Sequence, residues 1–103
     1  MQANEYQALA MRTAPENARM WSNVGLGLAG EAGEVADQIK KYLHQGHPLD
    51  REKLFEELGD VAWYVALGAT VLGVSLESVL EGNVAKLMKR YPQGFEAERS
   101  VNR

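Results

Sequence analysis

The chain has 103 residues, the length of one domain, and its 46% hydrophobic content is that of a folded protein. The absence of cysteine excludes disulfides, thiolate nucleophiles and sulfur-ligated metal sites. A net charge of −3 argues against a basic nucleic-acid-binding surface, and no apolar run is long enough to span a membrane. The first residues lack the features of a signal peptide. We therefore expect a single cytoplasmic domain, over residues 1–103, that binds neither nucleic acid nor membrane.

Hydrophobic periodicity predicts helices and no strand, so the expected fold class is all-α, a bundle of about four helices. Short connections between the last three helices favour antiparallel neighbours and hence a central helical hairpin. The polar tail over 96–103 is expected to be flexible. The expected helices cover about residues 4–13, 24–43, 51–72 and 76–90.

Residues with strong positional preferences mark the ends of these helices. Asn4 is expected to be the N-cap of the first helix, with Gln7 completing a capping box. Asp50 and Ser75 are expected to be the N-caps of the third and fourth helices. Gly73 lies where a left-handed residue can close the third helix. These assignments fix the lengths of the connections and therefore support the hairpin.

A Gly-x-Gly-x-x-Gly sequence is formed by Gly25, Gly27 and Gly30. In a dinucleotide-binding fold this sequence follows a strand and opens a helix within a βαβ unit. The residues before Gly25 do not form a buried strand pattern, and no later strand is predicted. We therefore interpret the glycines as a flexible entry to the second helix and as a point of close helix packing.

Two acidic pairs occupy the second and third expected helices. Glu31 and Glu34 form one pair, and Glu57 and Asp60 form the other after an interval of 22 residues. The i,i+3 spacing puts both carboxylates of a pair on one helix face. In a hairpin that turns near residues 47–48, the pairs are offset by about 4 residues, or ~6 Å of helix rise. The four carboxylates can therefore converge.

A convergent set of carboxylates needs a neutralising partner. Glu31 lies about 40° from the middle of the apolar stripe of its helix, and a carboxylate facing a core is costly unless paired, protonated or bound to metal. Neither pair contains histidine, so the oxygen donors favour Mg²⁺ or Mn²⁺. Gly33 and Gly59 would let a ligand or a second helix come near. The alternative interpretation is two solvated acidic faces that form surface salt bridges.

Cationic and amide side chains suitable for phosphate lie on the second and fourth helices. Asn83, Lys86 and Arg90 share one shoulder of the fourth helix, and their groups suit phosphate oxygens. A solvated polar shoulder is the alternative for these three. Lys41 lies on the same face as Glu34 and either binds phosphate or balances the local acids. Trp21 is a candidate for stacking on a base, although packing in a core or interface is the commoner role.

These motifs resemble those of the MazG-like, all-α nucleotide pyrophosphohydrolase superfamily. The resemblance covers about residues 4–95 and implies Mg²⁺-dependent hydrolysis of a nucleoside triphosphate, between its α- and β-phosphates, to a monophosphate and pyrophosphate. Mn²⁺ could substitute for Mg²⁺, and the protein would be a homodimer or homotetramer that acts in nucleotide-pool house-cleaning. The segments that carry the resemblance are Leu28-Ala-Gly-Glu-Ala-Gly-Glu34, Glu56-Glu-Leu-Gly-Asp-Val61 and Asn83-x-x-Lys86 leading into Arg90-Tyr91-Pro92.

The resemblance also implies a role for each site residue. One carboxylate that is not fully used as a ligand can take a proton from the attacking water, and Glu34 is our candidate for this general base. Two other classes of protein remain open: a non-enzymatic helical interaction module, which needs no metal, and a carboxylate-bridged iron or manganese enzyme with redox chemistry. The metal ligands would be Glu31, Glu34, Glu57 and Asp60, and the phosphate contacts Lys41, Asn83, Lys86 and Arg90.

Overall fold

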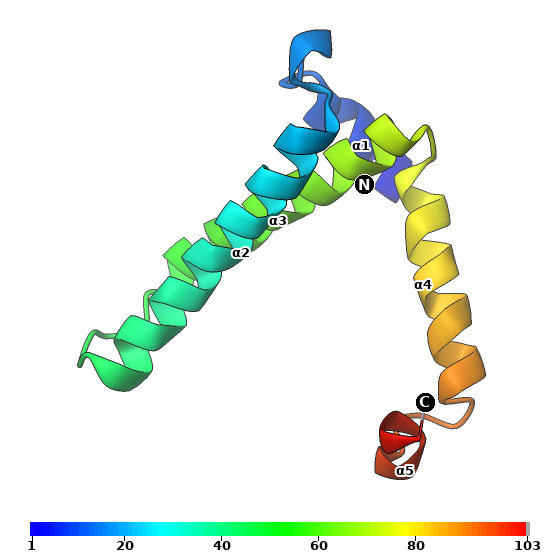
Figure 1. Cartoon of the computed structure of the whole chain (residues 1–103). Helices are drawn as coiled ribbons and strands as arrows, with labels where there is room; N and C mark the ends of the chain where they lie inside the picture. Colours follow the sequence, from blue (N-terminus) through cyan, green and yellow to red (C-terminus); the bar gives the residue numbers. More distant parts are fainter. Residues whose placement is uncertain (103) are drawn as a thin grey trace.

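The computed structural model describes residues 1–102, and within them it is helical with no strand (Figure 1). An isolated bridge between Pro92 and Gly94 is the only extended pairing in that part of the chain. The all-α class is therefore confirmed. The elements are α1 (Ala3–Met11), a short 3₁₀ turn (Glu16–Ala18), α2 (Trp21–His44), α3 (Arg51–Leu72), α4 (Leu76–Arg90) and α5 (Ala97–Val101).

Helices α2 and α3 form the expected antiparallel hairpin, which is the longest feature of the molecule (Figure 1). Asp50 caps α3, because its Oδ1 accepts a hydrogen bond from the backbone N–H of Lys53 at 3.0 Å. The ring of Tyr64 lies against α2 at Gly27, a position at which a Cβ atom would overlap the ring. Close packing therefore explains Gly27, as the sequence suggests.

Helix α1 packs across the open end of the hairpin and builds the core there. Trp63 links α3 to the end of α1, because its indole Nε1 donates to the carbonyl oxygen of Ala10 at 3.1 Å and to Oγ1 of Thr13 at 2.9 Å. This small core positions the hairpin relative to α1. Its buried members are Ala10, Met11, Ala14, Ala66, Leu67 and Leu76.

The predicted cap of α1 is wrong. The helix begins earlier, after Gln2, whose backbone N–H donates to the Glu5 carboxylate at 3.2 Å. Asn4 and Gln7 lie inside α1, and their amides reach the start of α4 instead. The Gln7 Oε1 accepts from the backbone N–H of Leu76 at 2.7 Å. The predictions for Ser75 as N-cap and Gly73 as C-cap are confirmed.

Helix α4 leaves α3 at an angle of 102° and runs away from the hairpin (Figure 1). Its apolar stripe is largely uncovered, with Leu80, Val84 and Leu87 exposed by 47%, 57% and 42%. Apolar surface also remains open on the hairpin, where Leu58 is 59% exposed. Uncovered apolar surface of this kind is typical of a region that contacts another molecule.

The last described residues form a short helix. Residues Ala97–Val101 of the expected flexible tail form the one-turn helix α5, and Arg103 lies outside the described residues. Within residues 1–102, no helix alone has the length and apolar content to cross a membrane, although α3 and α4 taken together would have them.

Candidate metal centre

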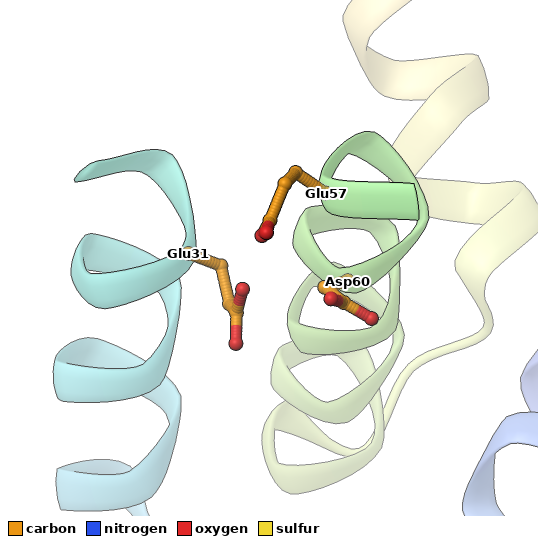
Figure 2. Close-up of side chains that lie close together, drawn as sticks. All are labelled: Glu31, Glu57 and Asp60. Atoms are coloured by element: carbon orange, nitrogen blue, oxygen red, sulfur yellow. The ribbon is translucent and has the colours of Figure 1, made fainter. Parts of the chain in front are cut away.

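Three of the predicted acidic residues meet between the two helices of the hairpin. Glu31 reaches across from α2, and Glu57 and Asp60 lie one turn apart on α3 (Figure 2). One carboxylate oxygen from each lies within 4.8 Å of the other two. The register of the hairpin, set by the Asp50 cap and the connection before it, brings the two acidic motifs level. We call these three residues the acidic triad.

The electrostatics of the acidic triad centre on Glu31. Partial burial raises the pKa of this carboxyl group, and the charge of Asp60, a hydrogen bond with Glu57 and the charges of Glu57 and Glu34 raise it further. None of the ion pairs within residues 1–102 involves the acidic triad. In the part of the chain that the structure describes, the three carboxylates therefore form no surface salt bridges, which were the alternative interpretation of the sequence.

The donor set fits a hard divalent cation. Three carboxylates offer only oxygen ligands, which Mg²⁺ and Mn²⁺ prefer, and no histidine lies in the acidic triad. Mg²⁺ usually keeps several waters and is bound by a few carboxylates together with substrate phosphates. A centre of three carboxylates, of which Asp60 is exposed, therefore has the composition expected of a site for such an ion and a phosphate ligand.

Glu34, the fourth predicted ligand, lies one turn from Glu31 toward the closed end of the hairpin and is exposed. It is not part of the acidic triad. Instead it lines a polar cavity that also contains Lys41. The structure thus brings Glu34 and Lys41 together, beside the acidic triad and within one chain.

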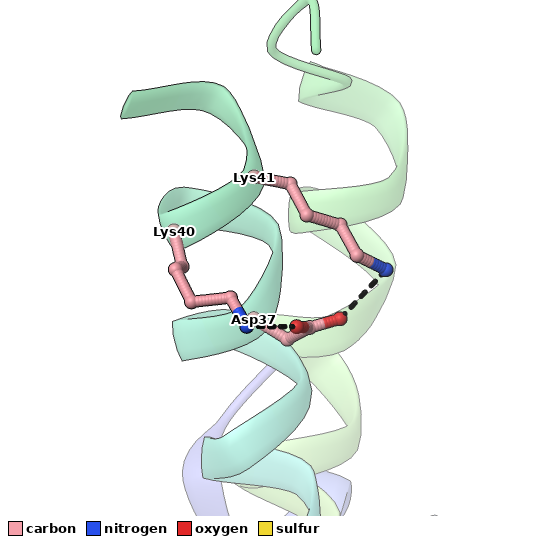
Figure 3. Close-up of polar contacts among 3 residues, drawn as sticks. All are labelled: Asp37, Lys40 and Lys41. Atoms are coloured by element: carbon pink, nitrogen blue, oxygen red, sulfur yellow. Dashed lines mark ion pairs between the residues drawn. The ribbon is translucent and has the colours of Figure 1, made fainter. Parts of the chain in front are cut away.

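Lys41 forms an ion pair that the sequence reasoning missed. Its Nζ lies 2.8 Å from a carboxylate oxygen of Asp37, and the Nζ of Lys40 lies 3.7 Å from the other (Figure 3). The hydrogen bond from Lys41 lowers the pKa of Asp37, and Asp37 in turn raises the pKa of Lys41. The i,i+4 spacing of Asp37 and Lys41 is typical of an ion pair on one helix and would have predicted this contact.

The remaining predicted contacts do not lie at the acidic triad. Asn83, Lys86 and Arg90 are on α4, which forms a separate arm in Figure 1. Trp21 is 61% exposed in the first turn of α2. It precedes Glu31 by ten residues, or about 15 Å of helix rise. Within a single chain these four residues stay apart from the acids, so their roles remain predictions.

Tyr6 is a second neighbour that the sequence reasoning missed. It lies on α1, is partly buried and packs against the core. Burial and the charge of Asp60 raise the pKa of its phenol, which places the ring in the electrostatic reach of the acidic triad. No spacing rule links Tyr6 to a residue on α3, because the contact exists only once α1 has packed on the hairpin.

The glycines inside the motifs have open space beside them. A side chain added at Gly33 or Gly59 would meet no atom within 4 Å. Among residues 1–102, no second helix therefore lies in contact with either position. Approach of a ligand or of another copy stays a prediction.

Residues 21–95 match the family described as the MazG nucleotide pyrophosphohydrolase domain, which covers both acidic motifs and the α4 cations. The chain belongs to this family, and the resemblance noted from its motifs is confirmed.

The chain is similar to one protein from a phage and one from a bacterium. Gene 37 protein of Mycobacterium phage L5 is 44% identical over 77 residues, covering 71% of this chain and 68% of that protein. The uncharacterized protein YvdC of Bacillus subtilis (strain 168) is 37% identical over 73 residues, covering 62% of this chain and 69% of that protein. Neither name states a substrate. No solved structure matches the chain.

Proposed function

We propose that the protein is a Mg²⁺-dependent nucleoside triphosphate pyrophosphatase that releases a nucleoside monophosphate and pyrophosphate. The observation that carries the proposal is the convergence of Glu31, Glu57 and Asp60, unpaired with any cation of residues 1–102, in a chain of the MazG family. The family supports a nucleotide substrate, and the oxygen-only donor set supports Mg²⁺, with Mn²⁺ able to replace it.

The acidic triad would hold the ion, with Glu34 completing the set. When bound, the ion neutralises triphosphate charge, polarises the α-phosphoryl group and lowers the pKa of bound water. Glu34 is suited to take a proton from the attacking water, because it lies one turn outside the acidic triad and is exposed. The water oxygen attacks the α-phosphorus, the bond from that phosphorus to the bridging oxygen breaks, and pyrophosphate leaves with the electron pair.

The phosphate contacts from α4 would require a second copy of the chain. Lys41 belongs to the hairpin that carries the acids, whereas Asn83, Lys86 and Arg90 lie on the α4 arm. We propose a homodimer or homotetramer in which α4 of another copy packs on the hairpin. The uncovered apolar residues support this packing, since those of α4 lie on the same helix as these cations, Leu58 lies on the hairpin, and one contact between copies would cover both surfaces.

Further parts of the proposal rest on the sequence. Trp21 is exposed and able to stack on a base. The single domain, the cytoplasmic location, the absence of nucleic-acid and membrane partners and a role in nucleotide-pool house-cleaning follow the expectations from composition and family. The choice of base and sugar is open, because no motif in the chain specifies it.

The deciding experiment is an assay of canonical and modified nucleoside triphosphates with Mg²⁺, Mn²⁺ or a chelator, in which products are separated and counted. Monophosphate and pyrophosphate should appear in equal amounts and only with metal. Glu57→Gln serves as the matched inactive control. Release of inorganic phosphate and a diphosphate would contradict cleavage at the α-phosphorus. A helical interaction module would release neither product.

A further inference from the structure

A polar cavity of about 340 Å³ lies at the closed end of the α2–α3 hairpin. This volume is at the lower end of the range for small-molecule sites, ~300–1,000 Å³. We call it the tip cavity. Its lining residues come from the end of α2, the connection and the start of α3: Glu34, Asp37, Gln38, Lys41, His47, Pro48, Asp50 and Lys53.

The tip cavity lies next to the acidic triad. Glu34 is one helical turn from Glu31 and forms part of the cavity wall. A ligand group in the cavity would therefore be adjacent to one held by the acidic triad. The remaining wall residues are hydrogen-bonding or charged, apart from Pro48. The cavity suits a compact polar group rather than a nucleobase, since bases bind by stacking on apolar or aromatic surfaces.

Two lysines face this space from opposite helices. Lys41 comes from α2 and Lys53 from α3, and His47 in the connection adds a ring with polar nitrogens. Lys53 takes part in no ion pair within residues 1–102. Asp50 accepts the Lys53 backbone N–H as the cap of α3, so part of its hydrogen-bonding capacity is already used. An anion bridging the two ammonium groups would tie the helices together.

Asp37 provides an exchangeable counter-ion. It holds Lys41 at 2.8 Å and Lys40 at 3.7 Å, one on each carboxylate oxygen (Figure 3). An arriving phosphate can take Lys41, because Asp37 keeps Lys40 as a partner. Lys40 itself does not line the cavity. The pair therefore lets Lys41 change partners without leaving an unpaired carboxylate.

We propose that the tip cavity binds the β- and γ-phosphates of the substrate and then the pyrophosphate product, with Lys41 and Lys53 as the cations, and that the phosphates displace Asp37 from Lys41. The proposal rests on the proposed function and adds the orientation of the substrate. The triphosphate runs toward the closed end of the hairpin, so the nucleoside points toward α1. The two hairpin lysines provide this subsite within one chain, independently of α4.

The test is calorimetric titration of the full-length protein with pyrophosphate in the presence of Mg²⁺. Lys53→Ala should weaken binding about tenfold, the scale of one charge-assisted hydrogen bond, and Lys53→Arg should restore much of it. Lys89→Ala is the matched control, because this exposed lysine lies on α4 outside the cavity, and it should bind as the parent does. Far-UV circular dichroism confirms that each variant is folded.

Two further variants test the counter-ion exchange. Asp37→Asn should tighten pyrophosphate binding several-fold, because Lys41 is then free. Lys40→Ala should weaken it, because Asp37 would then lose its remaining cation when Lys41 turns to the phosphate. Unchanged affinity in folded Lys53→Ala, or weaker binding in Asp37→Asn, would overturn the proposal.

The two proposals fail in different ways. If the protein cleaves a triphosphate to pyrophosphate but its affinity for pyrophosphate does not depend on Lys53, the proposed function stands and the subsite is refuted. If pyrophosphate binding depends on Lys53 but no triphosphate is cleaved, the tip cavity is an anion site and the proposed function is refuted.

Discussion

Gly27→Ala is the substitution whose effect the structure defines most sharply. A methyl group at this position would overlap the ring of Tyr64, which lies against the backbone of α2. The ring has little freedom to move away, because it also forms a T-shaped contact with Trp63 at a centroid distance of 4.9 Å. The two helices must therefore separate or the aromatic pair must repack.

Two opposing terms set the magnitude. Alanine is preferred over glycine in a helix interior by about 1 kcal/mol, whereas overpacking costs about 1–3 kcal/mol. Gly25→Ala is the matched control, because the same change in the same helix meets no atom within 4 Å and gains only the first term. The two variants should thus differ by about 1–3 kcal/mol in unfolding free energy. In a domain of this size each kcal/mol moves Tm by roughly 4–8 °C.

Urea and thermal unfolding, followed by circular dichroism at one protein concentration with a chelator, measure this difference. Gly27 lies one turn before Glu31, and Tyr64 lies one turn after Asp60. Separation of the helices should therefore also weaken metal binding in Gly27→Ala and leave it intact in Gly25→Ala. If the two variants are equally stable, the Tyr64 contact does not set the spacing of the hairpin.

Three other predictions concern the acids and cations. Glu57→Gln should abolish Mg²⁺ binding by calorimetry, and most pyrophosphatase activity, while helical circular dichroism is retained; full activity would refute the metal role. The folded state raises the pKa of Glu31 above its ordinary 4.5, so the unfolded chain loses this proton first. The unfolding free energy of the metal-free protein should therefore fall as pH rises from 4.5 through the raised pKa, and Glu31→Gln should flatten that fall. Lys86→Ala should lower kcat/KM by about one to two orders of magnitude without loss of metal binding. If each site combines residues of two copies, mixing Lys86→Ala chains with Glu57→Gln chains should restore activity. Failure to recover activity in verified mixed oligomers would count against shared sites.

The helices and most of their ends could be predicted because the signals are local. Asp50, Gly73 and Ser75 act within four residues of themselves, and their assignments are confirmed. The prediction that Asn4 and Gln7 cap α1 was wrong, because side-chain amides that suit a local cap also bind backbone groups far along the chain. The direction of α4 was not predictable, because an apolar stripe indicates that a helix packs against another surface but does not identify that surface.

The candidate site divides in the same way. Helical spacing and the length of the connection were enough to predict the meeting of Glu31, Glu57 and Asp60. The proximity of Tyr6 was not predictable, since it depends on how α1 packs on α3. The Asp37–Lys41 pair was predictable from its i,i+4 spacing, but the sequence analysis named only phosphate or the nearby acids in general as partners of Lys41 and did not single out Asp37.

Two side-chain amides of α1 determine where α4 lies. Gln7 receives the first backbone N–H of α4 and also donates to Thr70 Oγ1 and the Val74 carbonyl oxygen, both at 3.1 Å. Asn4 receives the next backbone N–H, that of Glu77, at 3.1 Å. Two neutral side chains near the start of the chain therefore fix the angle at which α4 departs. A single amide-to-alkyl change there would redirect a helix that lies some seventy positions later, together with every cation on it, and would leave each acidic residue where it is.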